Sequence, residues 1–236
     1  VKPLDDLPRV MDYWIKPYGK KAVAVKSTLA YQRDLDCVRT PPEEVEKAFL
    51  KKLNKEPLAP AEQKALEDHL FWHAVDRATE MGLPVKLHTG YYVGHGRMPL
   101  RRVQGNPAAI CELCQRSPET RFVLFHICYP YYEEMLSIAK HYPNAYMDMC
   151  WSWIINPLAA KDFLKKYLVT APANKICTFG GDYIPVELVP GHAAIARQGI
   201  TQALSELVDE GWMTLKEALN LTDVLMHQNA RTLYKL

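Results

Sequence analysis

The sequence predicts an α/β protein built on a parallel sheet. Short apolar runs of strand length alternate with longer segments whose apolar residues recur every three or four positions. Repeats of this kind are typical of parallel strands joined by right-handed helical crossovers. An open doubly wound sheet and a (β/α) barrel both fit. A complete eight-stranded barrel takes about 250 residues, so a barrel with the strands found here would lack three of them on the N-terminal side.

Five runs are predicted as strands because they are short, apolar and bounded by turn or polar residues. In chain order they cover residues 22–27, 84–89, 121–128, 145–150 and 176–182. Because successive side chains of a strand point to opposite faces, Lys86 should share a face with His88, and Leu124 with His126.

The segments between and after these strands have helical periodicity. They cover residues 43–53, 61–81, 107–116, 131–141, 159–168, 193–210 and 214–236. Asn106 before Pro107 is a helix-start signal, so residues 91–106 are predicted as a loop. Residues 53–60 are predicted as an interhelical loop.

Composition excludes several classes of protein. Apolar residues make up 48% and charged residues 24%, which is typical of a folded globular chain. A formal charge of +2 gives no strong field for nucleic acid or an anionic membrane, and no apolar run reaches membrane-spanning length. Six cysteines in a chain of this size are expected to be free thiols, and no secretory signal is visible, so we expect a cytoplasmic protein.

Polar side chains stand at the ends of all five predicted strands: Lys26, His88, His126, Asp148 and Asp182. The carboxyl ends of parallel strands meet at one edge of the sheet, where functional residues collect. Two imidazoles and a carboxylate brought together there suit a divalent transition metal such as zinc. The alternatives are ordinary buried histidines, each with a hydrogen-bond partner, and an Asp182 that only caps the following helix.

Three segments together resemble a known family. They are LPVKLHTGYY, RFVLFHICYPYYEEMLSIAKHYPNAYMDMCW and KICTFGGDY, and they resemble the fifth to eighth barrel strands of the amidohydrolase superfamily. The similarity is greatest to the amidohydrolase-2 branch, which contains lyases similar to aminocarboxymuconate semialdehyde decarboxylase and related metal-dependent hydrolases. The ending HQNARTLYKL is similar to the closing helix of that branch.

The resemblance implies a TIM-type (β/α) barrel of which this chain supplies the C-terminal part, as a single domain over residues 1–236. His88 and Asp182 would hold a divalent metal, with zinc expected and manganese or iron as alternatives. His126 would be a further ligand or an acid/base group facing the substrate. Asp182 would also carry a proton.

Lys26 ends what would be the fourth barrel strand. In some members of the superfamily a carboxylated lysine bridges two metals. The resemblance to the amidohydrolase-2 branch favours a lysine that orients a substrate anion or pairs inside the barrel.

The predicted loop 91–106 follows the strand of His88 and carries aromatic and basic residues that could close on a small substrate. Its arginines suit a carboxylate, because a guanidinium donates two parallel hydrogen bonds. A solvated basic loop and simple tryptophan packing are the alternatives. The residues predicted to contact substrate, besides Lys26, are Tyr91, His95, Arg97, Arg102 and Trp151.

One departure from the family is large, because the His-x-His pair of its first strand occurs nowhere in this sequence. His69 and His73 are four residues apart but are expected on an outer helix. The simplest interpretation is that the chain is the C-terminal part of a longer enzyme, which agrees with its start at Val1. We therefore expect a metal-dependent hydrolase acting on a small carboxylate, amide or lactone-like substrate. The alternatives are a non-oxidative decarboxylase using the same residues and a non-catalytic partial barrel that associates with a second copy through its exposed strand edges.

Overall fold

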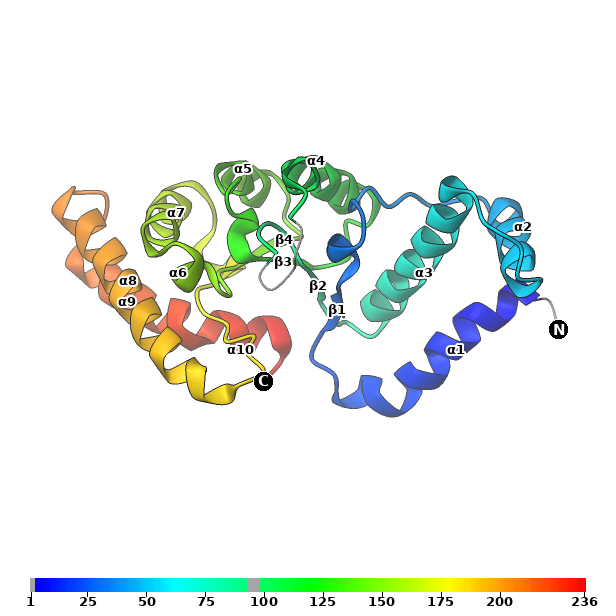
Figure 1. Cartoon of the computed structure of the whole chain (residues 1–236). Coiled ribbons are helices and arrows are strands. Elements are labelled where there is room, and N and C mark those ends of the chain that lie inside the picture. The colour runs from blue at the N-terminus through cyan, green and yellow to red at the C-terminus, as the bar shows by residue number, and fades with distance from the viewer. Residues whose placement is uncertain (1–2, 93–97) are drawn as a thin grey trace.

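A computed structural model of the chain describes residues 3–92 and 98–236. Its strands form one parallel sheet in the order β1-β2-β3-β4-β5, which confirms the α/β prediction (Figure 1). The five strands are β1 Val25–Ser27, β2 Val85–Leu87, β3 Phe122–Phe125, β4 Ala145–Asp148 and β5 Ile176–Cys177. Each lies within a predicted strand, but the last four end before the predicted boundary.

Ten α-helices surround this sheet in the described residues. They are α1 Pro3–Tyr18, α2 Pro42–Leu53, α3 Pro60–Glu80, α4 Leu100–Arg116, α5 Glu133–His141, α6 Ser152–Ile155, α7 Pro157–Thr170, α8 Val189–Asp209, α9 Leu215–Asp223 and α10 Asn229–Tyr234. The sequence did not predict α1 or α6. The single helix predicted over residues 214–236 is divided by a π-helical turn, Val224–Gln228, where the Thr178 hydroxyl donates to the Leu225 carbonyl at 2.7 Å.

The predicted loop 91–106 is wrong from Leu100 onward, because α4 begins there. Pro107 lies inside this helix instead of starting it, and its missing N–H would otherwise donate to the Val103 carbonyl. The Cys128 thiol lies 3.9 Å from that carbonyl and can donate to it. Burial raises the pKa of Cys128 to about 12, so the thiol keeps its proton. A residue distant in sequence thus offsets the helix-breaking effect of the proline.

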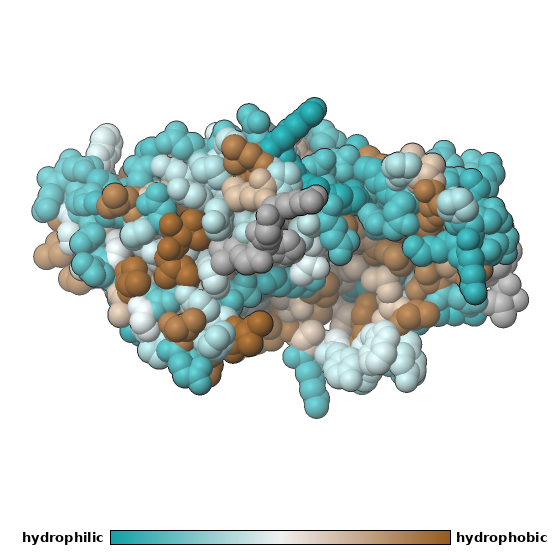
Figure 2. All heavy atoms as spheres, in the orientation of Figure 1, coloured by the Kyte–Doolittle hydropathy of each residue, from teal (hydrophilic) through white to brown (hydrophobic). Residues whose placement is uncertain are grey.

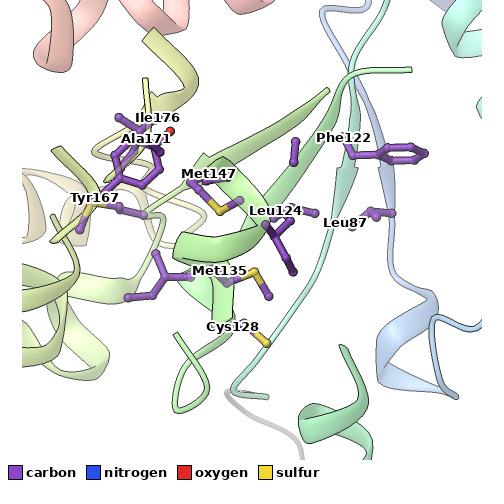
Figure 3. Close-up of a cluster of buried hydrophobic side chains, with 14 of the residues drawn as sticks. Leu87, Phe122, Leu124, Cys128, Met135, Met147, Tyr167, Ala171 and Ile176 are labelled. Carbon is purple, nitrogen blue, oxygen red and sulfur yellow. The ribbon is translucent and has the colours of Figure 1, made fainter. Parts of the chain in front are cut away.

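One face of the sheet forms the main hydrophobic core. Residues in register on this outer face include Leu87, Leu124 and Met147 of three neighbouring strands, all fully buried. Figure 3 shows them beside Phe122 and next to Met135 of α5. Burying side chains of this size contributes about 1.5–3 kcal/mol each, so this layer stabilises the sheet against α4, α5 and α7.

The opposite, inner face is mixed in character. Lys26, Lys86, Phe125 and Asp148 lie on it, as alternation along each strand requires. Both ammonium groups stand over the Phe125 ring, at 4.9 Å for Lys26 and 4.7 Å for Lys86. The C-terminal helix α10 lies on this side of the sheet, away from α4 and α5 (Figure 1), and its Leu233 packs with Phe125.

At the β1 end, the sheet is open within the described residues, since β1 pairs only with β2. A pocket of about 410 Å³ lies beside this edge between β1 and α3, and it is lined by apolar side chains such as Leu70 and Phe71. Figure 2 shows apolar atoms in the hollow on this side of the molecule. None of the described helices is long and apolar enough to span a membrane.

Two helical glycines provide a matched test of this packing. A Cβ atom on Gly199 of α8 would lie 2.1 Å from the ring of Trp153, whereas one on Gly105 of α4 meets nothing within 4 Å. We expect Gly199→Ala to lower the free energy of unfolding by about 1–3 kcal/mol because of overpacking. Gly105→Ala should raise it by about 0.5–1 kcal/mol, because alanine has less freedom in the unfolded chain. Urea unfolding of both variants measures the difference, and equal effects would contradict the packing described.

Candidate active site

A pocket of about 140 Å³ opens at the carboxyl end of the sheet. Five of the residues that the sequence predicted for the site line it. The lining consists of Tyr31, His88, Tyr91, His126, Trp151, Ile155 and Asp182. Both histidines and the aspartate therefore lie in one pocket, as expected for residues that follow neighbouring parallel strands.

His126 follows β3 and enters the pocket through an unusual backbone. His126, Ile127 and Cys128 all have positive φ, at 64°, 48° and 56°, and such conformations cost about 1–2 kcal/mol per residue. The strand therefore ends at Phe125, and the prediction that His126 shares a face with Leu124 is wrong. Leu124 points into the outer core, while the left-handed turn carries the imidazole to the pocket.

One hydrogen bond fixes the tautomer of the buried His126 ring. Its Nδ1 lies 2.7 Å from the Cys150 carbonyl oxygen. Because a carbonyl can only accept, Nδ1 carries the hydrogen and Nε2 of the neutral ring keeps the lone pair. Burial lowers the pKa of His126 to about 4, although the Cys150 hydrogen bond opposes that shift. The His126 ring is therefore neutral near pH 7, and its Nε2 lone pair is available to accept a proton or to bind a metal ion.

His88 comes directly after β2 and is buried beside His126. The two ring centroids lie 4.7 Å apart, with the planes at 62°. The Tyr31 ring covers His88 at a centroid distance of 4.1 Å. Two imidazoles from neighbouring strands therefore form the floor of one small pocket.

Asp182 reaches the pocket by a route that strand periodicity did not predict. The strand predicted over residues 176–182 ends at Cys177, and the segment after it lies against Cys150, which follows β4. Gly180 permits this close approach, because a Cβ atom there would lie 3.0 Å from the Cys150 Cβ. Asp182 itself has φ 48°. Its carboxylate accepts from Lys26 Nζ at 3.0 and 3.2 Å, which joins the β1 edge of the sheet to the segment after β5.

In type and place, the donor set fits a divalent cation: two buried imidazoles and a carboxylate line one pocket. Within residues 3–92 and 98–236, however, no three His, Cys, Asp or Glu side chains gather closely enough to enclose an ion. The Asp182 carboxylate is instead held by Lys26. A metal ion bound by Asp182 would therefore share the carboxylate with Lys26 or displace it.

The remaining predicted contacts have different outcomes. Tyr91 and Trp151 line the pocket, and the Trp151 indole N–H donates to the Asp182 carbonyl at 3.1 Å. Arg102 lies on α4, donates to the Tyr31 carbonyl at 3.3 Å and lines a separate groove, so the structure does not bring it to this pocket and its contact with substrate stays a prediction. His95 and Arg97 lie outside the described residues.

Tyr31 and Ile155 line the pocket but were not predicted. Tyr31 lies in the 3₁₀ turn Leu29–Tyr31 that follows β1. Its position in a loop after a strand was the feature of the sequence that could have identified it as a pocket residue. Two residues later, Arg33 forms ion pairs with the fully buried Asp68 and, at 2.8 Å, with Glu67 of α3. Asp68 also accepts from the Val38 N–H at 3.1 Å. This cluster fixes the loop that carries Tyr31.

Parallel strands in sequential order, with polar side chains gathered at their carboxyl ends, are typical of the (β/α) barrel class. Within that class, a family model described as amidohydrolase, Amidohydro_2, matches residues 53–236. The match covers well over half of the chain, so the protein belongs to the amidohydrolase family. This confirms the resemblance seen in the sequence.

Individual relatives are distant. Protein fluG of Emericella nidulans is 25% identical over 229 residues, which cover 91% of this chain and 26% of that protein. A proposed metal-dependent hydrolase from Lactobacillus casei has a similar structure, with a TM-score of 0.73 and 19% identity over 99% of this chain and 63% of the other. Uronate isomerase from Thermotoga maritima gives a TM-score of 0.67 and 15% identity over 86% of this chain and 48% of the other. These structural similarities support the TIM-barrel type of fold. The chain spans less than two thirds of each of these proteins.

Burial shifts the pKa values of two groups in and beside the pocket, His126 and Asp148, in opposite directions. Burial raises the pKa of Asp148 to about 6, despite the nearby Lys86 ammonium. Between about pH 6.5 and pH 4 the unfolded chain binds a proton at His126 more readily than the folded chain, so acid weakens the fold through His126. Between about pH 6 and pH 4 the folded chain binds a proton at Asp148 more readily, so acid strengthens the fold through Asp148.

Single variants should separate these two opposing contributions. On acidification from about pH 7 to about pH 4.5, we expect His126→Asn to gain about 2 kcal/mol in free energy of unfolding relative to the wild type, and Asp148→Asn to lose a similar amount. Urea unfolding at both pH values measures this. Parallel pH dependence in all three proteins would contradict the assignment.

Proposed function

We propose that this chain carries the metal-binding and proton-transfer residues of a hydrolase that acts on a small carboxylate, amide or lactone-like substrate. The observation that carries the proposal is the meeting of His88, His126 and Asp182 in one pocket of an amidohydrolase-family chain. They lie in the segments that follow three different strands, β2, β3 and β5, on the side of the sheet where barrel enzymes hold their catalytic groups.

His88 and Asp182 would hold the divalent ion, with His126 as a further ligand or as the acid/base group. Zinc suits two imidazoles and a carboxylate best, and manganese or iron are the alternatives. When bound, the ion supplies Lewis-acid polarisation of the substrate and lowers the pKa of a water molecule. Zinc takes four ligands, so donors beyond these three residues, or water, would complete its shell.

The protein's own groups then have distinct tasks. His126 keeps its Nε2 lone pair because Nδ1 donates to the Cys150 carbonyl, so it can bind a metal ion or accept a proton, and only after protonation can it donate to a substrate oxygen. The Asp182 carboxylate accepts the proton of the attacking water and passes it to the leaving group. Lys26, once released from Asp182, would pair with a substrate carboxylate. Tyr91 and Trp151 would enclose the substrate, and His95 and Arg97 stay predicted contacts.

The same residues could also serve a non-oxidative decarboxylation, since a proton donor and a polarising cation serve both reactions. The product decides between them. Release of carbon dioxide from a small carboxylic acid would indicate a lyase, and cleavage of an amide or lactone without carbon dioxide would indicate a hydrolase.

Metal content provides the direct test. Protein purified without chelator and loaded with zinc should hold close to one ion per chain by plasma mass spectrometry, and His88→Asn should lose most of it. His192→Asn is the matched control, because His192 is also buried but lies outside the pocket, against Phe179 and Tyr183. A metal-free wild type, or equal metal in wild type and His88→Asn, would refute the proposal.

A non-catalytic partial barrel is the second candidate, and the edges of the sheet favour it. Among the described strands β1 pairs only with β2 and β5 only with β4, and exposed edges are ready to pair with another chain. If the chain is a partial barrel of this kind, we expect light scattering to show a dimer or larger species and the protein to hold no zinc after loading. A zinc-loaded monomer would exclude it.

A further inference from the structure

The turn after β4 contacts both His126 and Asp182, the two proposed acid/base groups of the pocket. It begins at Asp148, whose side chain is 4% exposed on the inner face of the sheet. Asp148 Oδ1 accepts from the Cys150 backbone N–H at 2.9 Å. The carboxyl group therefore holds the peptide just before Cys150 and fixes how the chain leaves the strand.

The Cys150 carbonyl is the acceptor that fixes the His126 ring. The contact to Nδ1, at 2.7 Å, is the polar contact that sets the tautomer. If the turn rotated, this carbonyl would move away and the imidazole could take either tautomer. The orientation of His126 thus depends on a backbone group that Asp148 holds in place.

The same turn also holds Asp182. Trp151 has φ 65°, which a non-glycine residue adopts only under local constraint. Its indole N–H donates to the Asp182 carbonyl at 3.1 Å. A Cβ atom on Gly180 would lie 3.0 Å from Cys150 Cβ and 3.5 Å from Asp148 Oδ1, so the segment after β5 rests directly on this turn.

We propose that Asp148 is a positioning residue that acts through the Cys150–Trp151 turn to set the tautomer of His126 and the backbone position of Asp182. The inference rests on the proposed function, since it assigns the support of the same site. Asp148 lines no part of the pocket itself. Supporting groups of this kind typically change metal affinity or activity about 10- to 100-fold when removed.

Two substitutions separate positioning from bulk stability. Asp148→Asn keeps an oxygen that can accept from the Cys150 N–H, whereas Asp148→Ala removes it. In metal-free protein with ¹⁵N-labelled histidine, the nitrogen shifts of His126 should report the Nδ1–H form in the wild type and in Asp148→Asn. Asp148→Ala should give a mixture of tautomers. A purely structural role would leave the tautomer of a folded Asp148→Ala unchanged, and that result would overturn the proposal.

Zinc titration gives the second measurement. We expect Asp148→Ala to bind Zn²⁺ about 10- to 100-fold more weakly than the wild type, with Asp148→Asn close to the wild type. If Asp148→Ala does not fold, Trp151→Phe tests the contact to Asp182 alone, because it removes the indole N–H that donates to the Asp182 carbonyl. Zinc affinity should then fall while the His126 tautomer stays fixed. Unchanged zinc affinity would overturn the proposed role of the Cys150–Trp151 turn. A wild type that binds no zinc refutes the proposed function, while the metal-free tautomer measurement still decides the role of Asp148.

Discussion

The pocket depends on backbone conformations that its own residues disfavour. His126, Trp151 and Asp182 have φ of 64°, 65° and 48°, in the left-handed region where glycine is the usual occupant. Each is held by a partner: the Cys150 carbonyl for His126, the indole bond to Asp182 for Trp151, and Lys26 for Asp182. Backbone strain of this kind costs about 1–3 kcal/mol per residue and persists only where the surroundings enforce it. The enforcing contacts are therefore as necessary to the pocket as the side chains that line it.

The two faces of the sheet divide stability from chemistry. The outer face buries leucine, phenylalanine and methionine side chains against helices, and it contains no charged side chain among the registered positions of β2, β3 and β4. The inner face carries Lys26, Lys86 and Asp148 next to Phe125. A rigid outer layer allows the inner layer to hold costly polar groups in fixed positions, since buried charges need compensating partners.

The strands, most of the helices and the meeting of His88, His126 and Asp182 could be predicted from sequence. Apolar periodicity can be read from a few neighbouring residues. Once parallel strands are predicted, their carboxyl ends must meet at one edge of the sheet, so the residues that follow them can be placed together. The start of α4 could not be predicted, because Cys128 offsets Pro107 from a distant segment. The face of His126 was predicted wrongly, because alternation assumes an extended backbone and this residue is left-handed. Tyr31 was missed although it follows a predicted strand, because the ion pair of Arg33 with Asp68 that fixes its loop joins residues far apart in the sequence.

The ion pair between Lys26 and Asp182 joins residues 156 positions apart in the chain. Closing so long a loop early in folding costs conformational entropy without an immediate gain, so contacts of this kind form after local helices and adjacent strands. We therefore expect the following order of folding events. Helix pairs such as α2 with α3 can assemble first, then β2 with β3 and β4, and the pocket last, when both the β1 edge and the segment after β5 are in place. Helical structure is therefore expected to return earlier in refolding than the ability to bind a ligand.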